Sequence, residues 1–187
     1  AAAAGGITTL IDMPLNSSPV TTDTEKLHLK IDSAKNKLYV DVGFYGGLIP
    51  ENINELNSLI QSGVVGLKAF MVDSGLDEFP FVNETDIRKA FEKLKDHRNV
   101  PVLFHAEIDC GFEKPDDYSG DSFNSFLKTR PENWENQAVE LLIKLCREYN
   151  QRIHIVHLSS GESVEMIRAA KKEGLPLTVE TCPHYLY

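Results

Sequence analysis

A lysine stands inside an apolar run of this sequence, at Lys68 in the string GLKAF. Burying an ammonium group is unfavourable unless the group is paired, neutralised or modified. Three interpretations are compatible with the position alone. The side chain can carry its amine to the surface at a strand end, form a Schiff base with a carbonyl substrate, or react with CO2 to give an anionic carbamate that bridges two metal ions.

Histidines end two later apolar runs. The string VLFHAE places His105 there, and HIVHLSS places His154 and His157. Since side chains on a strand alternate between two faces, only one of His154 and His157 can point inward. We expect it to be His157, nearer the strand end, with His154 packed or facing outward. Imidazole binds zinc, iron and other divalent metals, so Lys68, His105 and His157 are candidate metal ligands.

Prolines and small polar residues follow the first and last apolar runs, in DMPLNSSP and ETCPHYL. Such segments are typical of loops that line the mouth of a site. Asn16 and Ser17 are candidate substrate-binding residues, although they could equally cap the next helix. Cys182 and His184 are interpreted as a packed thiol and a structural histidine. No carboxylate at a strand end is an obvious general base, so we predict metal ligands without a complete catalytic set.

Six short runs rich in β-branched and apolar residues must position these side chains, and they are predicted to be strands. Segments with helical spacing lie between them, which favours a parallel sheet. Helices are predicted over 24–34, 84–96 and 164–174, and a polar insertion over 109–131. The predicted strands cover residues 7–13, 39–45, 65–70, 100–107, 153–159 and 177–182.

The length of the chain limits the architecture. A (β/α)8 (TIM) barrel takes about 250 residues, and this chain has 187. Six strands give about 31 residues per βα unit, so two further units would be needed for closure. We therefore predict an α/β fold, a partial barrel of about six units in a single domain over residues 1–187. A doubly wound open sheet is the alternative, although no G-x-G-x-x-G follows any predicted strand.

Composition excludes several classes of partner. The formal net charge is −9, which disfavours nucleic acid and anionic membrane surfaces and leaves a small molecule as the expected partner. The apolar stretch over 1–15 contains Asp12 and is shorter than the roughly 20 residues that span a bilayer. It also lacks the features of a signal peptide, and three widely spaced cysteines indicate no disulfide framework. We expect a protein of the cytoplasm or of an organelle, such as the peroxisome or mitochondrion, that is not secreted.

Five strings together resemble the cyclic amidohydrolases: GGITTLIDMPLNSSPVT, GVVGLKAFM, VLFHAE, HIVHLSS and ETCPHYL. The segment MPLN-x-x-P-x-T resembles the allantoinase branch in particular. The resemblance implies a metal-dependent barrel with two divalent ions, expected to be zinc. It implies that carboxylated Lys68 bridges the ions and that His105 and His157 bind the second one.

The resemblance also implies what lies outside this chain. The family's H-x-H ligand pair would precede Ala1, and its catalytic aspartate would follow Tyr187. The chain then corresponds to barrel strands 2 to 7, without the first and last strands. It contains no catalytic residue, and we expect this fragment alone to be inactive.

The function implied is hydrolysis of the cyclic amide of allantoin to allantoate, in purine and ureide catabolism, by a homo-oligomer. Dihydropyrimidinase (hydantoinase) and dihydroorotase activities are the alternatives within the family. A Schiff-base aldolase using Lys68 is a second enzyme class, in which two strand-end histidines have no required role. A non-catalytic dihydropyrimidinase-related scaffold is the third alternative.

Overall fold

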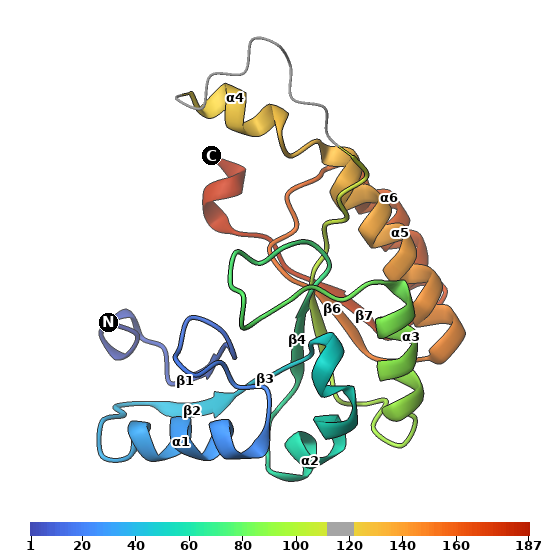
Figure 1. Ribbon diagram of the computed structural model, residues 1–187. Helices are drawn as coiled ribbons and strands as arrows, with labels where there is room; N and C mark the ends of the chain where they lie inside the picture. Colours follow the sequence, from blue (N-terminus) through green and yellow to red (C-terminus); the bar gives the residue numbers. More distant parts are fainter. Residues whose placement is uncertain (112–121) are drawn as a thin grey trace.

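The computed structural model describes residues 1–111 and 122–187. All strand pairs in it are parallel, and strands follow one another in chain order across two sheets (Figure 1). The smaller sheet pairs β1 with β2, and the larger one runs from β3 to β7. The strands are β1 (Thr9–Asp12), β2 (Asp41–Phe44), β3 (Gly46–Gly47), β4 (Leu67–Phe70), β5 (Val102–His105), β6 (Ile153–Ile155) and β7 (Leu177–Val179).

One bent pass of the chain connects the two sheets. Only Tyr45 separates β2, which pairs with β1, from β3, which pairs with β4. Backbone bonding continues across the bend, because the Val65 amide donates to the Phe44 carbonyl at 3.0 Å and the Gly46 amide donates to the Gly66 carbonyl at 3.0 Å. The six predicted strands therefore correspond to six passes of the chain, and the parallel arrangement is confirmed.

Helices separate the strands as the sequence predicts. Asp23 begins α1 by accepting a bond from the Lys26 amide at 2.8 Å, and Asn83 begins α3 by accepting from the Asp86 amide at 3.0 Å. Each cap satisfies an amide that the helix itself leaves unpaired. The α-helices are α1 (Thr24–Ala34), α2 (Leu56–Gln61), α3 (Glu84–Lys93), α4 (Phe123–Lys128), α5 (Glu132–Tyr149) and α6 (Ser163–Lys172), and the 3-10 helices are η1 (Ala3–Gly5), η2 (Pro50–Glu55) and η3 (Pro183–Leu186).

Two differences from the prediction concern the region after β5. The helix α4 lies within the segment 109–131 that was predicted to be an insertion loop, of which residues 112–121 lie outside the described part. The long helix α5 was not predicted. It buries one apolar side, including Trp134 and Leu142, against the sheet and its neighbouring helices. No helix in the described ranges combines the length and the apolar character that crossing a membrane requires.

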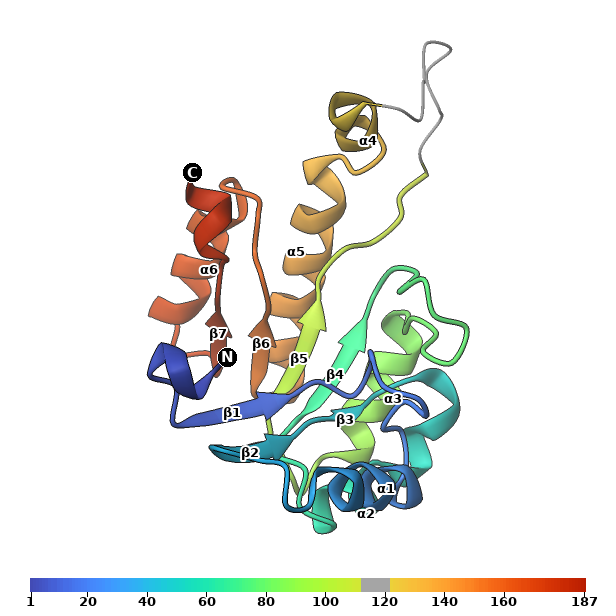
Figure 2. The same ribbon diagram turned by 90° about the vertical axis from the view of Figure 1, so that its left-hand side faces the viewer.

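The two faces of the larger sheet have different roles. Helices α3, α5 and α6 cover one face, and Figure 2 shows strands β4 to β7 in front of α5 and α6. Alternating strand residues such as Ala69 and Phe104 are fully buried in the core under these helices. By the same alternation, Lys68, Leu103 and His105 lie on the opposite face. The helices therefore supply the core, and the other face carries the polar side chains.

A second, smaller apolar cluster supports the polar face. It consists of Val20, Ile49 and Phe79, with Leu15 and Phe70 packed against it. These residues come from the loops after β1, β3 and β4 and from the end of β4 itself. Gly47 makes the packing possible, because a Cβ there would lie 2.6 Å from the Phe79 ring. The cluster therefore ties the loop that contains Asn16 and Ser17 to strand β4.

Candidate metal centre

Lys68 is buried on β4, with a side chain that is not extended to the surface. The residue is 3% exposed, its Nζ donates to the Ala69 carbonyl at 2.9 Å, and Nζ lies 3.8 Å from the centre of the Phe70 ring. Within residues 1–111 and 122–187, no carboxylate forms a salt bridge with it. Burial lowers the pKa of the Lys68 amine to about 7. Because Lys68 is 3% exposed, extension of its side chain to the surface is the wrong interpretation of the three. The lowered pKa leaves a neutral fraction at neutral pH, and the neutral amine is the nucleophilic form.

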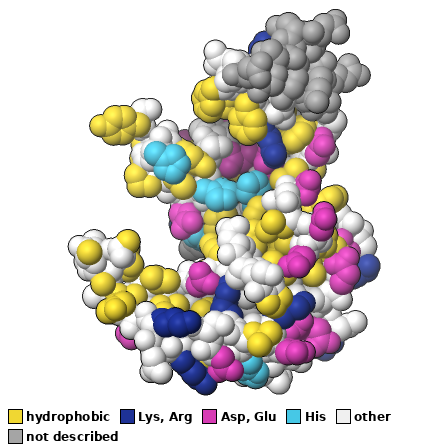
Figure 3. All heavy atoms as spheres, turned by 60° about the vertical axis from the view of Figure 1, so that its left-hand side comes forward, with side chains coloured by type: hydrophobic (Ala, Val, Ile, Leu, Met, Phe, Trp, Pro, Cys, Tyr) yellow, Lys and Arg dark blue, Asp and Glu magenta, His cyan; other side chains and the backbone are white. Residues whose placement is uncertain are grey.

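His105 and His157 meet at the carboxyl ends of neighbouring strands. Nδ1 of His105 lies 3.1 Å from Nε2 of His157, and the ring centres are 4.7 Å apart. Phe70, which is the partner of His105 in the β4–β5 register, stacks on the His105 ring at 4.8 Å. Because Phe70 contacts both Lys68 and His105, the three candidate ligands form one group. Figure 3 shows histidine side chains gathered in the hollow middle of this face.

The prediction that only one of His154 and His157 points inward, with His154 packed or facing outward, is wrong as to the face of His154. His154 is paired with Leu103 in the β5–β6 register, so it lies on the same face as Lys68 and His105. Its Nδ1 lies 2.8 Å from the Thr178 hydroxyl, and its Nε2 lies 3.4 Å from the Glu180 carboxylate. Strand β6 ends at Ile155, and His157 has a positive φ of 42°. Strand alternation does not extend past the end of β6. His154, within the strand, and His157, two positions after its end, therefore both reach the polar face.

Glu107 fixes the orientation of the His105 ring. Its Oε2 lies 2.9 Å from Nε2 of His105 and accepts a bond from Nη1 of Arg130 at 3.0 Å. Burial alone would raise the pKa of the Glu107 carboxyl, but the hydrogen bonds of His105 and Arg130 bring it below its usual range. An ionised carboxylate only accepts, so Nε2 of His105 carries the hydrogen and Nδ1 presents a lone pair toward His157. This is the pattern by which a carboxylate orients a metal-binding histidine.

The pKa of His157 is lowered, first by burial and then by the nearby His105 and Lys68. A neutral imidazole is the form that binds a metal ion. Behind His157, the turn after β6 is attached to α5 through Glu135, which accepts bonds from the Ser159 and Ser160 amides. Burial therefore favours the neutral form of the His157 imidazole, and Glu135 holds the turn that follows it.

These side chains fit part of a metal centre. Two nitrogens that bind one tetrahedral zinc at about 2.1 Å lie roughly 3.4 Å from each other, close to the 3.1 Å between the two imidazoles. A carbamate on Lys68 would remove the unpaired ammonium and add oxygen donors beside them. No cluster of three or more His, Cys, Asp or Glu side chains that could hold a metal occurs in the described ranges. Toward such a centre, the described residues would supply two imidazoles and one lysine.

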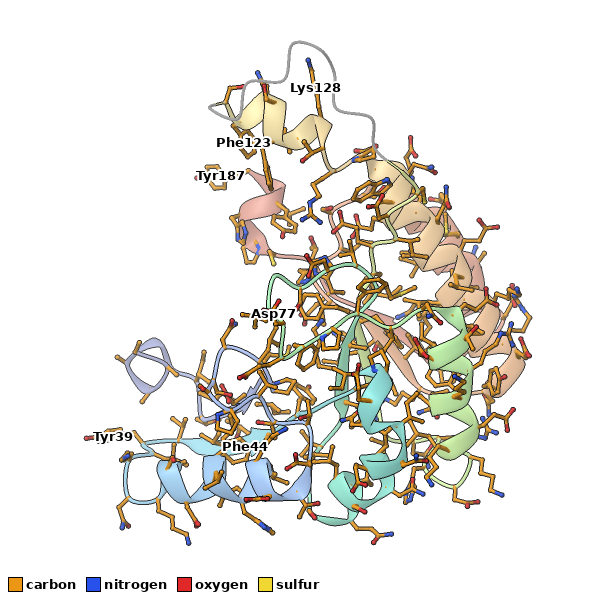
Figure 4. The ribbon with its side chains drawn as sticks, in the orientation of Figure 1. Tyr39, Phe44, Asp77, Phe123, Lys128 and Tyr187 are labelled. Atoms are coloured by element: carbon orange, nitrogen blue, oxygen red, sulfur yellow. The ribbon has the colours of Figure 1, made fainter. Side chains whose placement is uncertain are left out.

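Asn16 and Ser17 lie in the loop after β1 and border a different groove. Asn16 has a positive φ of 63°, and Oγ of Ser17 donates toward the Pro14 and Pro19 carbonyls at 3.4 and 3.3 Å. With residues from the loop after β4, including Asp77, they line a groove of about 400 Å³. Asp77 is labelled on that loop in Figure 4. The alternative that these two residues cap the next helix is wrong, because Asp23 caps α1.

Two other features lie away from the histidines. Cys182 is half-buried, in line with a packed thiol, whereas His184 is exposed and contacts the Tyr185 ring. A cavity of about 610 Å³ lies between the N-terminal residues, α1 and the β1–β2 sheet, bordered by Tyr39 and Phe44 (Figure 4). Its lining contains neither histidine nor cysteine, so the chemistry places the candidate centre at His105 and His157 instead.

Sequence reasoning missed four residues that hold the candidate ligands. Phe70 and Glu107 each lie two positions after a candidate ligand, so strand alternation could have placed Phe70 beside Lys68. Arg130 and Glu135 flank the start of α5, and nothing in their local pattern separates them from other surface charges. Their roles come from the fold, which brings the start of α5 over the ends of β5 and β6.

Curated proteins and solved structures match the chain over nearly its whole length. No family model matches it. The chain is 50% identical to "Allantoinase, mitochondrial" of Aquarana catesbeiana and 48% identical to "Allantoinase" of Arabidopsis thaliana, in both cases over 100% of its length. It covers 38% and 39% of those relatives, and so spans about two fifths of their length.

A solved structure supports the fold independently. The L-hydantoinase (dihydropyrimidinase) from Arthrobacter aurescens matches with a TM-score of 0.87 and 28% identity, over 99% of this chain and 42% of that one. The prediction of a partial α/β barrel is confirmed, because the parallel sheet and its helices correspond to part of the barrel of that protein.

Proposed function

This chain is a homologue of the allantoinases and belongs with them to the cyclic amidohydrolases, and from that premise we propose that it forms the central part of an enzyme that hydrolyses allantoin to allantoate. In this proposal, residues 1–187 are one incomplete barrel domain. The activity belongs to the full-length protein, and the isolated chain is inactive.

The observation that carries the proposal is the convergence of three side chains on one face of the sheet. Lys68 is buried without a carboxylate partner among the described residues, and the His105 and His157 nitrogens lie 3.1 Å apart beside it. Phe70 contacts both Lys68 and His105. A buried lysine with a lowered pKa next to paired imidazoles is poorly explained by packing alone, whereas a carbamate-bridged metal pair accounts for all three residues.

Each residue has a role in the proposed centre. Carboxylated Lys68 would hold two divalent ions, which we propose to be zinc, and His105 and His157 would provide nitrogen ligands to one of them. When bound, such ions supply a nucleophile from water at neutral pH and polarise a carbonyl oxygen, which is the chemistry that opens a cyclic amide. Glu107 holds the hydrogen of His105 on Nε2, so that Nδ1 stays available. Asn16 and Ser17 contact the substrate from the loop after β1.

Allantoin is favoured over other cyclic amides by the degree of similarity. Identity is 50% to the Aquarana catesbeiana allantoinase and 28% to the L-hydantoinase of similar fold. A catalytically silent scaffold is disfavoured because Lys68, His105 and His157 are all present and converge. We further propose a homo-oligomer that acts on a neutral small molecule. For its location we propose the cytoplasm or an organelle, the peroxisome or the mitochondrion; the last is the compartment in the name of the Aquarana catesbeiana relative.

The experiment is a substrate panel on the full-length protein. Allantoin, dihydrouracil, hydantoin and dihydroorotate are supplied separately, and ring opening is followed by product analysis, with residues 1–187 alone as the control. We expect allantoate from the full-length protein, little turnover of the other rings, and no turnover by the isolated chain. Preferred hydrolysis of dihydrouracil or hydantoin would show that the protein is a hydantoinase rather than an allantoinase. No turnover of any ring by metal-loaded protein would favour the scaffold.

A further inference from the structure

We propose that Glu135, on α5, is the positioning residue for His157: it holds the turn after β6 so that Nε2 of His157 faces Nδ1 of His105. This inference rests on the proposed function, because metal binding is the purpose of the imidazole geometry that Glu135 holds. The positioning itself can be tested without metal.

Among the described residues, every hydrogen bond to the Glu135 carboxylate comes from the turn that follows His157. The Ser159 amide donates to its two oxygens at 3.0 and 3.2 Å, and the Ser159 hydroxyl donates to Oε2 at 2.7 Å. The Ser160 amide donates to Oε2 at 2.6 Å. Ser160 is 1% exposed, so its amide would be left without water if the carboxylate were removed. One glutamate thus satisfies two consecutive backbone donors.

The turn needs an external support because its backbone conformation is unusual. His157 has a φ of 42°, in the left-handed region that residues with a Cβ seldom adopt. Sheet bonding is present on either side of it, from the Val156 amide to the Phe104 carbonyl and from the Leu158 amide to the Glu180 carbonyl. His157 itself turns out of that pattern. A conformation of this kind persists where its surroundings hold it.

The start of α5 is itself well anchored, which is what a support requires. Trp134 is buried, and its carbonyl accepts a bond from the Ile108 amide just after β5 at 3.1 Å. Asn136, which follows Glu135, accepts bonds through Oδ1 from the Ser160 and Ser163 hydroxyls at 2.7 and 2.6 Å. Strand β5, which carries His105, and the turn that carries His157 are therefore attached to the same helical turn. This common attachment acts together with the β5–β6 pairing to define the distance between the two imidazoles.

An ordinary role in stability is the competing explanation, and it predicts different measurements. A carboxylate that only stabilises the loop would, when replaced, lower the unfolding temperature and leave the geometry of the two imidazoles unchanged in the folded protein. A positioning residue would, when replaced, change that geometry in protein that is still folded.

The test compares E135Q and E135A with E140Q in the full-length protein. Glu140 is an exposed residue of the same helix, so E140Q repeats the loss of charge without touching the turn. Each protein is loaded with Co²⁺, and the visible absorption spectrum and the rate of Co²⁺ release to a chelator are recorded. Crystal structures of the metal-free forms give the distance between Nδ1 of His105 and Nε2 of His157.

For E135Q and E135A we expect a changed cobalt spectrum and metal affinity reduced about 10- to 100-fold, as for other residues that orient metal ligands. We also expect a longer distance between the imidazoles in the metal-free crystals and no change for E140Q. Unchanged spectra, release rates and imidazole geometry in E135Q and E135A would overturn the proposal. If the unaltered protein binds no cobalt, the proposed function fails, and the metal-free crystal structures still decide the role of Glu135. If E135A does not fold, E135Q alone decides it.

Discussion

Nδ1 of His105 and Nε2 of His157 lie 3.1 Å apart, although 52 positions separate the two residues in the sequence. They meet because β5 and β6 are parallel neighbours whose carboxyl ends lie at the same edge of the sheet. His105 is the last residue of β5, and His157 follows β6 by two positions. The distance between the rings is thus set by the strand pairing and by the turn after β6.

The carboxylate that orients His105 gives a first prediction. In the full-length protein, E107Q should reduce metal affinity about 10- to 100-fold, because an amide is a weaker acceptor for the Nε2 hydrogen of His105. R130Q should act in the same direction with a smaller effect, since Arg130 contacts the ring only through Glu107. Competition with a chromogenic chelator measures both. E92Q, on the exposed side of α3, is the control. Unchanged affinity in E107Q would mean that Glu107 does not orient the ligand.

Lys68 gives a prediction on pH. Burial lowers the pKa of its amine from 10.5 to about 7, so the charged form is disfavoured in the folded state and the neutral fraction grows as the pH rises through 7. Between pH 6 and pH 8, the neutral fraction should rise from about a tenth to about nine tenths. Carbamate formation consumes the neutral amine and CO2 and releases a proton, so at a fixed CO2 concentration the carbamate signal should rise from pH 6 to pH 8. Labelled ¹³C-bicarbonate and NMR measure it in metal-free protein, with K68R as the blank. Equal carbamate signals at pH 6 and pH 8 would contradict this assignment.

The lowered pKa of Lys68 also makes the stability of the folded protein depend on pH. Between pH 7 and pH 10.5 the unfolded chain binds more protons at Lys68 than the folded chain does, so this residue makes the free energy of unfolding rise with pH in that range. Below pH 7 both states are protonated and the full penalty of the buried charge remains. Urea unfolding of metal-free K68M at pH 7 and pH 9 should therefore show a smaller pH dependence than the unaltered protein. Identical pH dependence in both proteins would be the contrary result.

The three cysteines differ in their environments, and two of them make a test of the core. Cys146 is fully buried, and burial raises the pKa of its thiol to about 11, whereas Cys110 is exposed. At pH 8 about one Cys146 in a thousand would be ionised even if it were accessible. Iodoacetamide followed by peptide mass analysis should modify Cys110 in native protein and Cys146 only in denaturant. Rapid native labelling of Cys146 would show that the α5 core is not packed as described.

Gly66 gives a prediction for the strand that carries Lys68. A Cβ at Gly66 would lie 2.8 Å from the Pro101 carbonyl oxygen, which is backbone and cannot rotate away. G66A should lower the free energy of unfolding by about 1–3 kcal/mol. The matched control is G161A, where nothing lies within 4 Å of a Cβ, and the change should be neutral or slightly stabilising. Thermal or urea unfolding compares them, and equal stability of the two variants would be the contrary result.

The sequence predicts the parallel order of the strands and the convergence of Lys68, His105 and His157, because polar residues at the carboxyl ends of consecutive parallel strands must approach one another. It does not predict the face of His154. That inference assumed continuous alternation, and the strand ends at Ile155, before a left-handed residue. Local sequence also contains no signal for Glu135. Its partners are backbone amides 24 and 25 positions away, and only the tertiary fold brings them together.

The central claim is that Lys68, together with His105 and His157, holds a pair of metal ions. The most direct test is the metal content of the full-length protein and of its K68A variant, measured by elemental analysis after gel filtration. K89A, which changes an exposed lysine on α3, is the control. We predict two divalent ions per chain in the unaltered protein and in K89A, and loss of metal and of allantoin hydrolysis in K68A. Retention of both metals with full activity in K68A would contradict the account.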